Sequence, residues 1–322
     1  MNRRDFVRSA AAGAAAAAAP GLAQAQANYI RLLLSSSPGG TADALFRVME
    51  EPLRAALGSP VIMEYKPGAG GITGHMEVSR GPRDGSLLGY AYSGPMSTIP
   101  ILRPELGFDP RRDVMPAAMI MKTPVVFMAN PKVPGNDMAA ILEYAKSRPQ
   151  GINCGNSGMG SAGHITAVYF ASRTGMNTIH VPYKGNGPAV QALVGGEIEL
   201  VSAVTSSAIT TLASSGRIKI VGVASAEASP VVPGVVPISK LIPGFTSEVM
   251  HGVVAPAGTP DEVVRRVNAA FVKVLSDKNI QERFLANSCV AMPGTPAQYA
   301  QAIAAEFDQW QAVIRKSGIK ME

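Results

Sequence analysis

Short apolar runs alternate with amphipathic stretches along most of the chain. Runs typical of buried strands lie at Tyr29–Leu34, Val61–Tyr65, Leu87–Tyr92, Val125–Ala129, Thr178–Val181, Ile198–Val201 and Ile218–Ala224. Apolar residues at helical spacing occupy Ala42–Leu57, Asp137–Lys146, His164–Thr174 and Pro188–Val194. This alternation predicts an α/β fold with a mainly parallel sheet covered by helices.

Two helices near the C-terminus are marked by their first residues. Thr259-Pro-Asp-Glu262 and Thr295-Pro-Ala-Gln298 each place a hydroxyl at the cap and a Glu or Gln three residues later. Both predict a capping box, in which the two side chains satisfy free amides of the first turn. Pro52, inside the first predicted helix, should kink or split it, because proline lacks the amide donor.

Residues 1–27 have the pattern of an export signal. Arg3 and Arg4 precede an Asp-Phe pair and an alanine-rich run that Pro20 interrupts, which is typical of a twin-arginine signal. The run is too short to span a bilayer. We expect cleavage near Ala25 or Ala27 and a periplasmic mature protein.

Composition excludes some classes of partner. The net charge is +6, but charged residues make up only 16% of the chain. No Lys/Arg cluster follows residue 28, so we expect no nucleic-acid partner. The four histidines show no metal-ligand spacing, and we expect neither a metal nor a cofactor. Cys154 and Cys289 could pair in an oxidising compartment or remain buried thiols, and the sequence leaves both open.

Four glycine-rich segments stand where a predicted strand gives way to a helix. They are residues 37–43, 66–74, 155–163 and 182–188. Glycine lets backbone amides approach a ligand, and a helix N-terminus adds partial positive charge. Parallel sheets bind ligands outside the carboxyl ends of their strands. The segments therefore predict an anion site without arginine, the alternative being four ordinary tight turns.

Two enzyme motifs are incomplete in the third segment. Residues 158–163 fit G-x-G-x-x-G, but the first acid that follows is Glu197, too far along for dinucleotide binding. Around Ser157 a nucleophile elbow would need glycine where Met159 stands. An exported serine hydrolase built on Ser157 and His164 remains an alternative function.

The order of these motifs resembles the solute receptors of tripartite tricarboxylate transporters, the Bug-type family. The matching stretches are Pro38–Asp43, Lys66–Gly71, Gly155–His164 and His180–Gly185. The resemblance implies a type II periplasmic-binding-protein fold, with two lobes around a ligand cleft. Lobe 1 would comprise residues 28–125 plus 253–322, and lobe 2 residues 126–252.

The resemblance also implies a function. Such a receptor closes like a Venus flytrap on a small-molecule carboxylate, often a dicarboxylate, and delivers it to integral membrane transporter subunits without turnover. We expect a monomer. The ligand-binding residues carried over by position are Pro38, Gly39, Gly40, Asp43, Gly70, Ser93, Ser157, Gly158, Gly160, Ser161, His164, Tyr183, Lys184 and Gly185. A periplasmic sensor that hands its loaded form to a signalling partner is a further alternative.

The chain departs from its relatives on the side expected to set selectivity. Gly196–Glu199 replaces a frequent G-x-V-D strand start, and residues 201–205 lack an acid that would suit an ammonium group. The relatives often carry tryptophan just before the glycine at position 252, where this chain has His251. These departures leave the identity of the carboxylate open.

Overall fold

The structure is a computed structural model that describes residues 29–36, 38 and 41–317, without the side chain of Thr41. The predicted export signal lies outside these residues. The strands are β1 (Ile30–Leu34), β2 (Val61–Tyr65), β3 (Leu87–Tyr92), β4 (Val114–Ala129), β5 (Ile152–Asn156), β6 (Thr178–Pro182), β7 (Leu200–Val204), β8 (Lys219–Val223), β9 (Glu248–Pro256) and β10 (Val290–Gly294).

Helices follow most of the strands. The α-helices are α2 (Thr41–Leu57), α3 (Ile72–Ser79), α4 (Ile99–Leu102), α5 (Pro110–Asp113), α6 (Met138–Lys146), α7 (Ala162–Thr174), α8 (Asn186–Gly195), α9 (Ser207–Ser214), α10 (Asp261–Leu275), α11 (Lys278–Ala286) and α12 (Pro296–Ser317). The short helices are η1 (Ala69–Gly71), η2 (Gly94–Thr98), η3 (Pro104–Leu106) and η4 (Ile238–Lys240).

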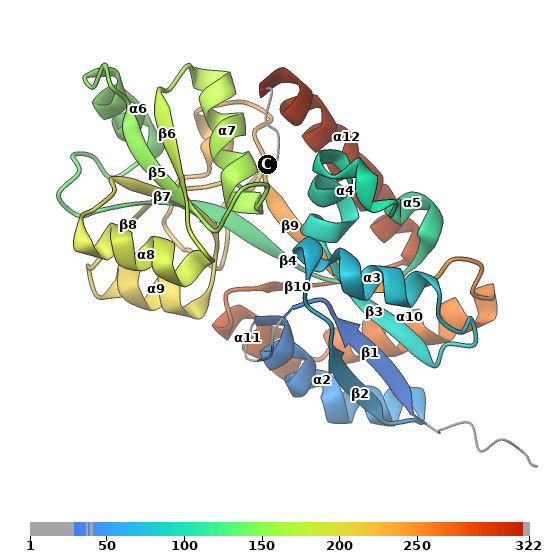
Figure 1. The fold of residues 1–322 in the computed structure, drawn as a ribbon. Helices are drawn as coiled ribbons and strands as arrows, with labels where there is room; N and C mark the ends of the chain where they lie inside the picture. The colour runs from blue at the N-terminus through green and yellow to red at the C-terminus, as the bar shows by residue number, and fades with distance from the viewer. Residues whose placement is uncertain (1–28, 37, 39–40, 318–322) are drawn as a thin grey trace, which may run out of the picture.

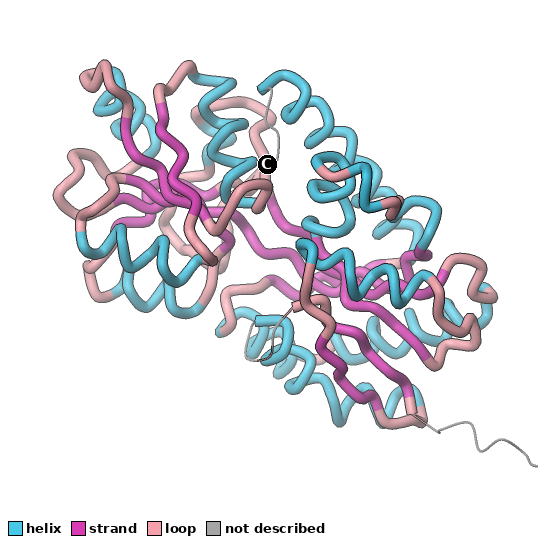
Figure 2. The backbone as a smooth tube through the Cα atoms, viewed as in Figure 1, coloured by secondary structure: helices cyan, strands magenta, loops and turns pink. Residues whose placement is uncertain are grey.

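The molecule has two α/β lobes (Figure 1). In the first, β2, β1 and β3 pair in parallel, and in the second β7, β5 and β6 do the same. Two long antiparallel strands, β4 and β9, lie between these sets in the order β2-β1-β3-β9-β4-β7-β5-β6. The predicted α/β class and the two-lobed arrangement are therefore confirmed, and Figure 2 shows the strands continuing from one lobe into the other.

Strand β4 belongs to both lobes. Its first part pairs with β9 as far as Pro124, opposite Glu248, whereas from Val125 onward it pairs with β7 and β8. The sequence predicted only the last third of this strand, Val125–Ala129. The change of partners beside Val125 supports the proposed lobe boundaries, which remain our proposal.

The hydrophobic cores follow the same division. One pair of clusters packs β1 and β3 against α2, α3, α10 and α11, with the first half of α12. The other pair, which includes Phe127, Phe170 and Leu200, packs the strands between residues 125 and 249 against α6, α7 and α8. Each lobe thus buries its own apolar side chains.

Helix α12 contacts both lobes. Tyr299 and Ile303 are buried in the first lobe, whereas Trp310 packs on Ile165 of α7. The rings of Trp310 and Tyr169 meet edge to face at 6.0 Å. This last described helix therefore contacts both lobes, at the upper right of Figure 1.

Of the two predicted capping boxes, one was confirmed and the other was wrong. The Thr295 amide donates to Gln298 Oε1 at 2.8 Å and the Gln298 amide donates to Thr295 Oγ1 at 3.2 Å, as a capping box requires. The prediction at Thr259 was wrong: α10 begins at Asp261 without a side-chain cap, and the Thr259 hydroxyl donates to the Pro256 carbonyl. Helix α2 continues through Pro52, so the predicted split does not occur.

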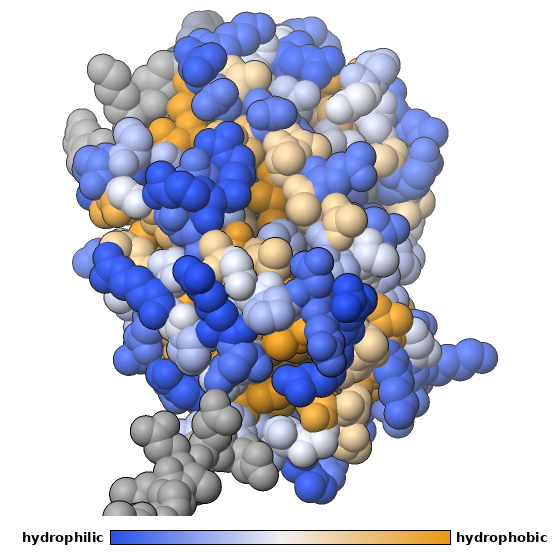
Figure 3. Space-filling model, turned by 90° about the vertical axis from the view of Figure 1, so that its right-hand side faces the viewer, coloured by the Kyte–Doolittle hydropathy of each residue, from blue (hydrophilic) through white to orange (hydrophobic). Residues whose placement is uncertain are grey.

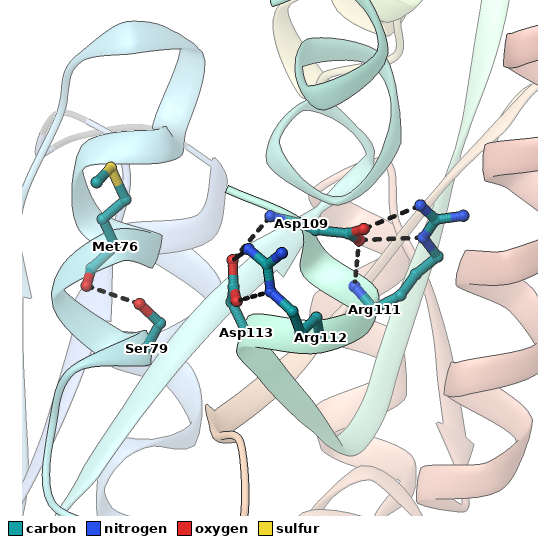
Figure 4. Close-up of polar contacts among 6 residues, drawn as sticks. All are labelled: Met76, Ser79, Asp109, Arg111, Arg112 and Asp113. Atoms are coloured by element: carbon teal, nitrogen blue, oxygen red, sulfur yellow. Dashed lines mark hydrogen bonds and ion pairs between the residues drawn. The ribbon is translucent and has the colours of Figure 1, made fainter. Parts of the chain in front are cut away.

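A short helix, α5, introduces the long strand β4. Asp109 caps it by accepting the Arg111 amide at 3.0 Å, and Asp113 Oδ2 accepts the Asp109 amide at 2.8 Å (Figure 4).

The face of the molecule drawn in Figure 3 is mainly hydrophilic, with apolar areas between the hydrophilic side chains. In the part of the chain that the structure describes, no helix is long and apolar enough to cross a membrane.

Candidate functional site

A cavity of about 530 Å³ lies where the two lobes face each other. It is lined by Ser36, Ala42, Gly70, Tyr90, Tyr92, Ser93, Gly94, Ile99, Ser157, Met159, Gly160, Ser161, Ala162, Asn186, Val204, Val249 and His251. A second hollow of about 550 Å³ lies between α2, α10 and α11, away from the carboxyl ends of the strands. We place the site in the first cavity, where an α/β sheet binds ligands.

All four glycine-rich segments contribute to this one cavity. Ala42 comes from the first, Gly70 from the second, residues 157 and 159–162 from the third, and Asn186 from the fourth. Sequence alone allowed four unrelated turns on separate faces. The structure brings the turns of both lobes together.

Helices begin at the cavity wall on both sides. In lobe 2, α7 begins at Ala162, and its cap Ser161 accepts the His164 amide at 3.2 Å. The next helix, α8, begins at Asn186. In lobe 1, α2 begins at Thr41, beside the lining residue Ala42. These starts present amide donors and partial positive charge, which favour a bound anion.

The lining is uncharged. Among the described residues, no Lys, Arg, Asp or Glu lines the cavity. Burial lowers the pKa of His251 to about 3, so this histidine is neutral near pH 7. Any charge on a ligand would therefore be balanced by backbone dipoles rather than by a counter-ion.

His164 orders the third glycine turn from behind. Its Nδ1 accepts the Gly160 amide at 3.2 Å, and its ring meets the ring of His180 edge to face at 5.2 Å. Burial, together with the nearby His180, lowers the pKa of His164 to about 4. No hydrogen bond joins Ser157 to His164 among the described contacts, and the hydrolase alternative gains no support from this geometry.

In lobe 1 the Ser93 loop rests on α12. Ser93 is buried and precedes η2, a π-helix in which the Ser97 hydroxyl is 2.7 Å from the Ser93 carbonyl oxygen and 2.9 Å from Glu306 Oε1. The Trp310 indole also donates to Glu306, at 3.1 Å. Burial raises the pKa of Glu306, while the hydrogen bonds from Ser97 and Trp310 oppose that rise. The helix that joins the lobes therefore also supports the cavity wall.

Several predicted residues do not line the cavity. Asp43 is buried, where it accepts the Tyr65 hydroxyl at 2.7 Å and pairs with Arg47 at 2.8 Å. Pro38 and Lys184 are exposed. The other predicted ligand-binding residues that do not line the cavity are Gly158, His164, Tyr183 and Gly185. Gly39 and Gly40 lie outside the described residues. Roles for all of these in binding remain predictions.

Sequence reasoning missed the aromatic part of the wall. Tyr90 and Tyr92 stack at 5.6 Å, and Tyr90 and His251 stack at 5.8 Å. In the sequence Tyr90 and Tyr92 are ordinary members of an apolar run, whereas His251, noted only as a departure from the relatives' tryptophan, was not assigned to a strand. Asn186 could have been found, because it belongs to the fourth glycine-rich segment.

The other candidates for special chemistry are metal-ligating side chains and the two cysteines. Within the described ranges, no group of three or more His, Cys, Asp or Glu side chains could hold a metal ion. Cys154 and Cys289 are buried and free, so the structure contains the pair of thiols rather than the disulfide.

Comparison with known proteins agrees with this architecture. The model of the tripartite tricarboxylate transporter family receptor matches residues 45–319. Protein BugT of Bordetella pertussis is 30% identical over 298 residues, which cover 92% of this chain and 91% of BugT.

Two solved structures from Rhodopseudomonas palustris share the fold. MatC with bound malate has 26% sequence identity and a TM-score of 0.76, over 89% of this chain and 98% of MatC. A second protein, solved with adipate, has 26% identity and a TM-score of 0.79, over 91% of this chain and 98% of its own. The family match covers most of both lobes and all of the cavity lining except Ser36 and Ala42. The chain therefore belongs to the tripartite tricarboxylate transporter receptor family, whose members are periplasmic solute-binding proteins.

Proposed function

We propose that this chain captures a small organic carboxylate in the cavity between its lobes and delivers it to the membrane subunits of a tripartite tricarboxylate-type transporter. The observation that carries the proposal is the convergence of four glycine turns and three helix starts on one uncharged cavity. Amide donors suit a carboxylate, because they stabilise negative charge without a buried cation.

The relatives support the carboxylate class. MatC was solved with malate and the second R. palustris protein with adipate. A dicarboxylate has one acidic group for the helix starts of each lobe, so it can bridge the lobes as they close. Export through the predicted twin-arginine signal would place the receptor in the periplasm, cleaved near Ala25 or Ala27.

Thermal unfolding of the mature protein with a panel of mono-, di- and tricarboxylates tests the proposal. A ligand at 100 times its dissociation constant stabilises the native state by about 2.7 kcal/mol, which a melting curve resolves. The absence of stabilisation by every member of the panel would contradict carboxylate capture.

A pair of serine variants localises the binding. Ser157→Ala removes a hydroxyl from the cavity wall, whereas Ser172→Ala removes an exposed hydroxyl of α7. We expect weaker carboxylate binding in the first variant and unchanged binding in the second. Equal affinities in both variants would place the ligand elsewhere. Uptake of the bound carboxylate by cells that lack the gene separates a transport receptor from a sensor.

A further inference from the structure

His251 lies on β9, one of the two strands that run between the lobes, and lines the cavity. In the sheet register it lies opposite Tyr92, and Tyr90 lies two residues before Tyr92 on the same strand. Residues two apart on a strand share a face. Val249 and His251 of β9 therefore line the cavity together with Tyr90 and Tyr92 of β3.

The hydrogen bond between Tyr90 and His251 determines where the imidazole carries its proton. The Tyr90 hydroxyl lies 2.6 Å from His251 Nδ1, and Tyr90 is only 4% exposed. If the hydroxyl donates to Nδ1, the proton of the neutral ring is on Nε2. The opposite tautomer would leave two groups unsatisfied, the tyrosine O–H and the bare Nε2. We therefore assign the tautomer with Nε2–H.

This Nε2–H group has no acceptor in the described part of the protein, although its surroundings are buried. His251 is 8% exposed, and burial keeps its ring neutral. A buried donor without a partner is costly, so a ligand acceptor would satisfy it. The Asn186 Oδ1 and Ser36 Oγ atoms are unpaired in the same way on the wall of the same cavity.

We propose that His251 is a specificity-determining residue and that the preferred ligand is a carboxylate that also carries a hydroxyl or keto oxygen. That neutral oxygen accepts the hydrogen bond from Nε2–H, while helix-start amides hold the carboxylate. The inference rests on the proposed function. A second carboxylate at His251 would be desolvated without a cation among the lining residues, so a neutral acceptor fits this position better.

Pairs of carboxylates that differ by this one oxygen test the proposal. Succinate is compared with malate, and glutarate with 2-oxoglutarate, by calorimetric titration of the mature protein. We expect the wild type to bind the oxygen-bearing member of a pair more tightly. In His251→Phe this preference should fall by about 2- to 10-fold, the range for one lost hydrogen bond. His251→Gln keeps an amide donor and should retain much of the preference.

Nitrogen NMR of the labelled wild-type histidines gives a readout that needs no variant. We expect the Nε2–H tautomer of His251 before ligand is added, and a shift of its Nε2 signal with the oxygen-bearing ligand only. Tyr90→Phe should weaken the preference as well. It removes the hydroxyl that donates to His251 Nδ1, so the proton of the ring is no longer held on Nε2.

The outcomes separate the two proposals. If no carboxylate binds, the proposed function fails. If carboxylates bind but no pair shows the preference, or the preference survives intact in His251→Phe, only the inference about His251 is overturned. If His251→Phe does not fold, the wild-type preference and the NMR signal decide.

Discussion

Gly163 allows α7 to begin close against β7, and its replacement by alanine is a sharp test of how the cavity is built. Gly163 lies in the first turn of α7 and does not line the cavity. A Cβ atom added there would lie 2.1 Å from the Ser202 carbonyl oxygen and 3.1 Å from the Ala203 Cα. Both neighbours are backbone atoms of a buried strand, so no side chain can rotate away.

The magnitude follows from the size of this overlap. Ordinary van der Waals contact begins at 3.4 Å, so α7 must move away from β7 by more than an ångström. Overpacking of this kind costs about 3 kcal/mol, the upper part of the usual range. With an unfolding entropy of about 2.1 cal/mol/K per residue over roughly 290 residues, that loss lowers Tm by about 5 °C. The same shift moves Gly160, Ser161 and Ala162, so carboxylate affinity should fall although no lining residue has changed.

Circular dichroism melting and calorimetric titration of Gly163→Ala measure both effects. Gly187→Ala is the matched control, because Gly187 lies in the first turn of α8 with nothing within 4 Å of its added Cβ. The control should be unchanged or more stable by about 0.5–1 kcal/mol, since alanine favours the helix. A wild-type melting curve and wild-type affinity for Gly163→Ala would refute the close approach of α7 to β7.

Three further predictions concern stability and the thiols. Burial lowers the pKa of His75 to about 4 and that of His251 to about 3, against about 6.5 in the unfolded chain, so the unfolded state binds more protons. The free energy of unfolding should therefore fall as pH decreases from about 6.5 towards 4, and urea titrations that show no fall over that window would contradict the burial of the two rings. Thr295→Ala should cost about 1 kcal/mol in the same urea assay, because it removes the capping box of α12; an unchanged midpoint would mean that this box contributes nothing. Cys154 and Cys289 should react with a thiol reagent only after unfolding, because both are buried and burial raises their pKa values to about 12 and about 11. Failure to detect two thiols in the unfolded chain would indicate a disulfide.

The sequence predicted β1, β2 and β3, the parallel strands of the first lobe, better than the strands between the lobes, and it missed β5, a parallel strand of the second lobe. β2 and β3 begin and end where the apolar runs do. Most of β4 was missed because Pro116 and Pro124 interrupt its pattern, and proline usually excludes a central strand. In the structure a register shift follows Pro116, and the strand changes partners just after Pro124. Local propensity cannot reveal this, because the compensation comes from strands distant in sequence.

The residues of the candidate site also fall into those that the sequence predicted and those that it missed. Glycine at a strand–helix junction is a local signal, and it led to Gly70, Gly160 and their neighbours in the cavity wall. Tyr90 and His251 are 161 residues apart, and nothing in the sequence relates them until β3 pairs with β9. The partnership of α12 with α7 was hidden for the same reason. The error at Thr259 has a local cause. Its hydroxyl donates to the Pro256 carbonyl and does not accept a hydrogen bond from a first-turn amide of α10.

The unbroken course of β4 from one lobe into the other has a consequence for how the molecule moves. Because there is no loop at the crossing, any rotation of one half against the other must be absorbed as extra twist in paired strands and as sliding where Trp310 meets Tyr169. Twisting a ladder of hydrogen bonds is gradual, so the two lobes should rotate against each other only by small, mutually coupled amounts. For the same reason we expect both lobes to unfold together on heating. A protease that attacks flexible joints would find none at this position.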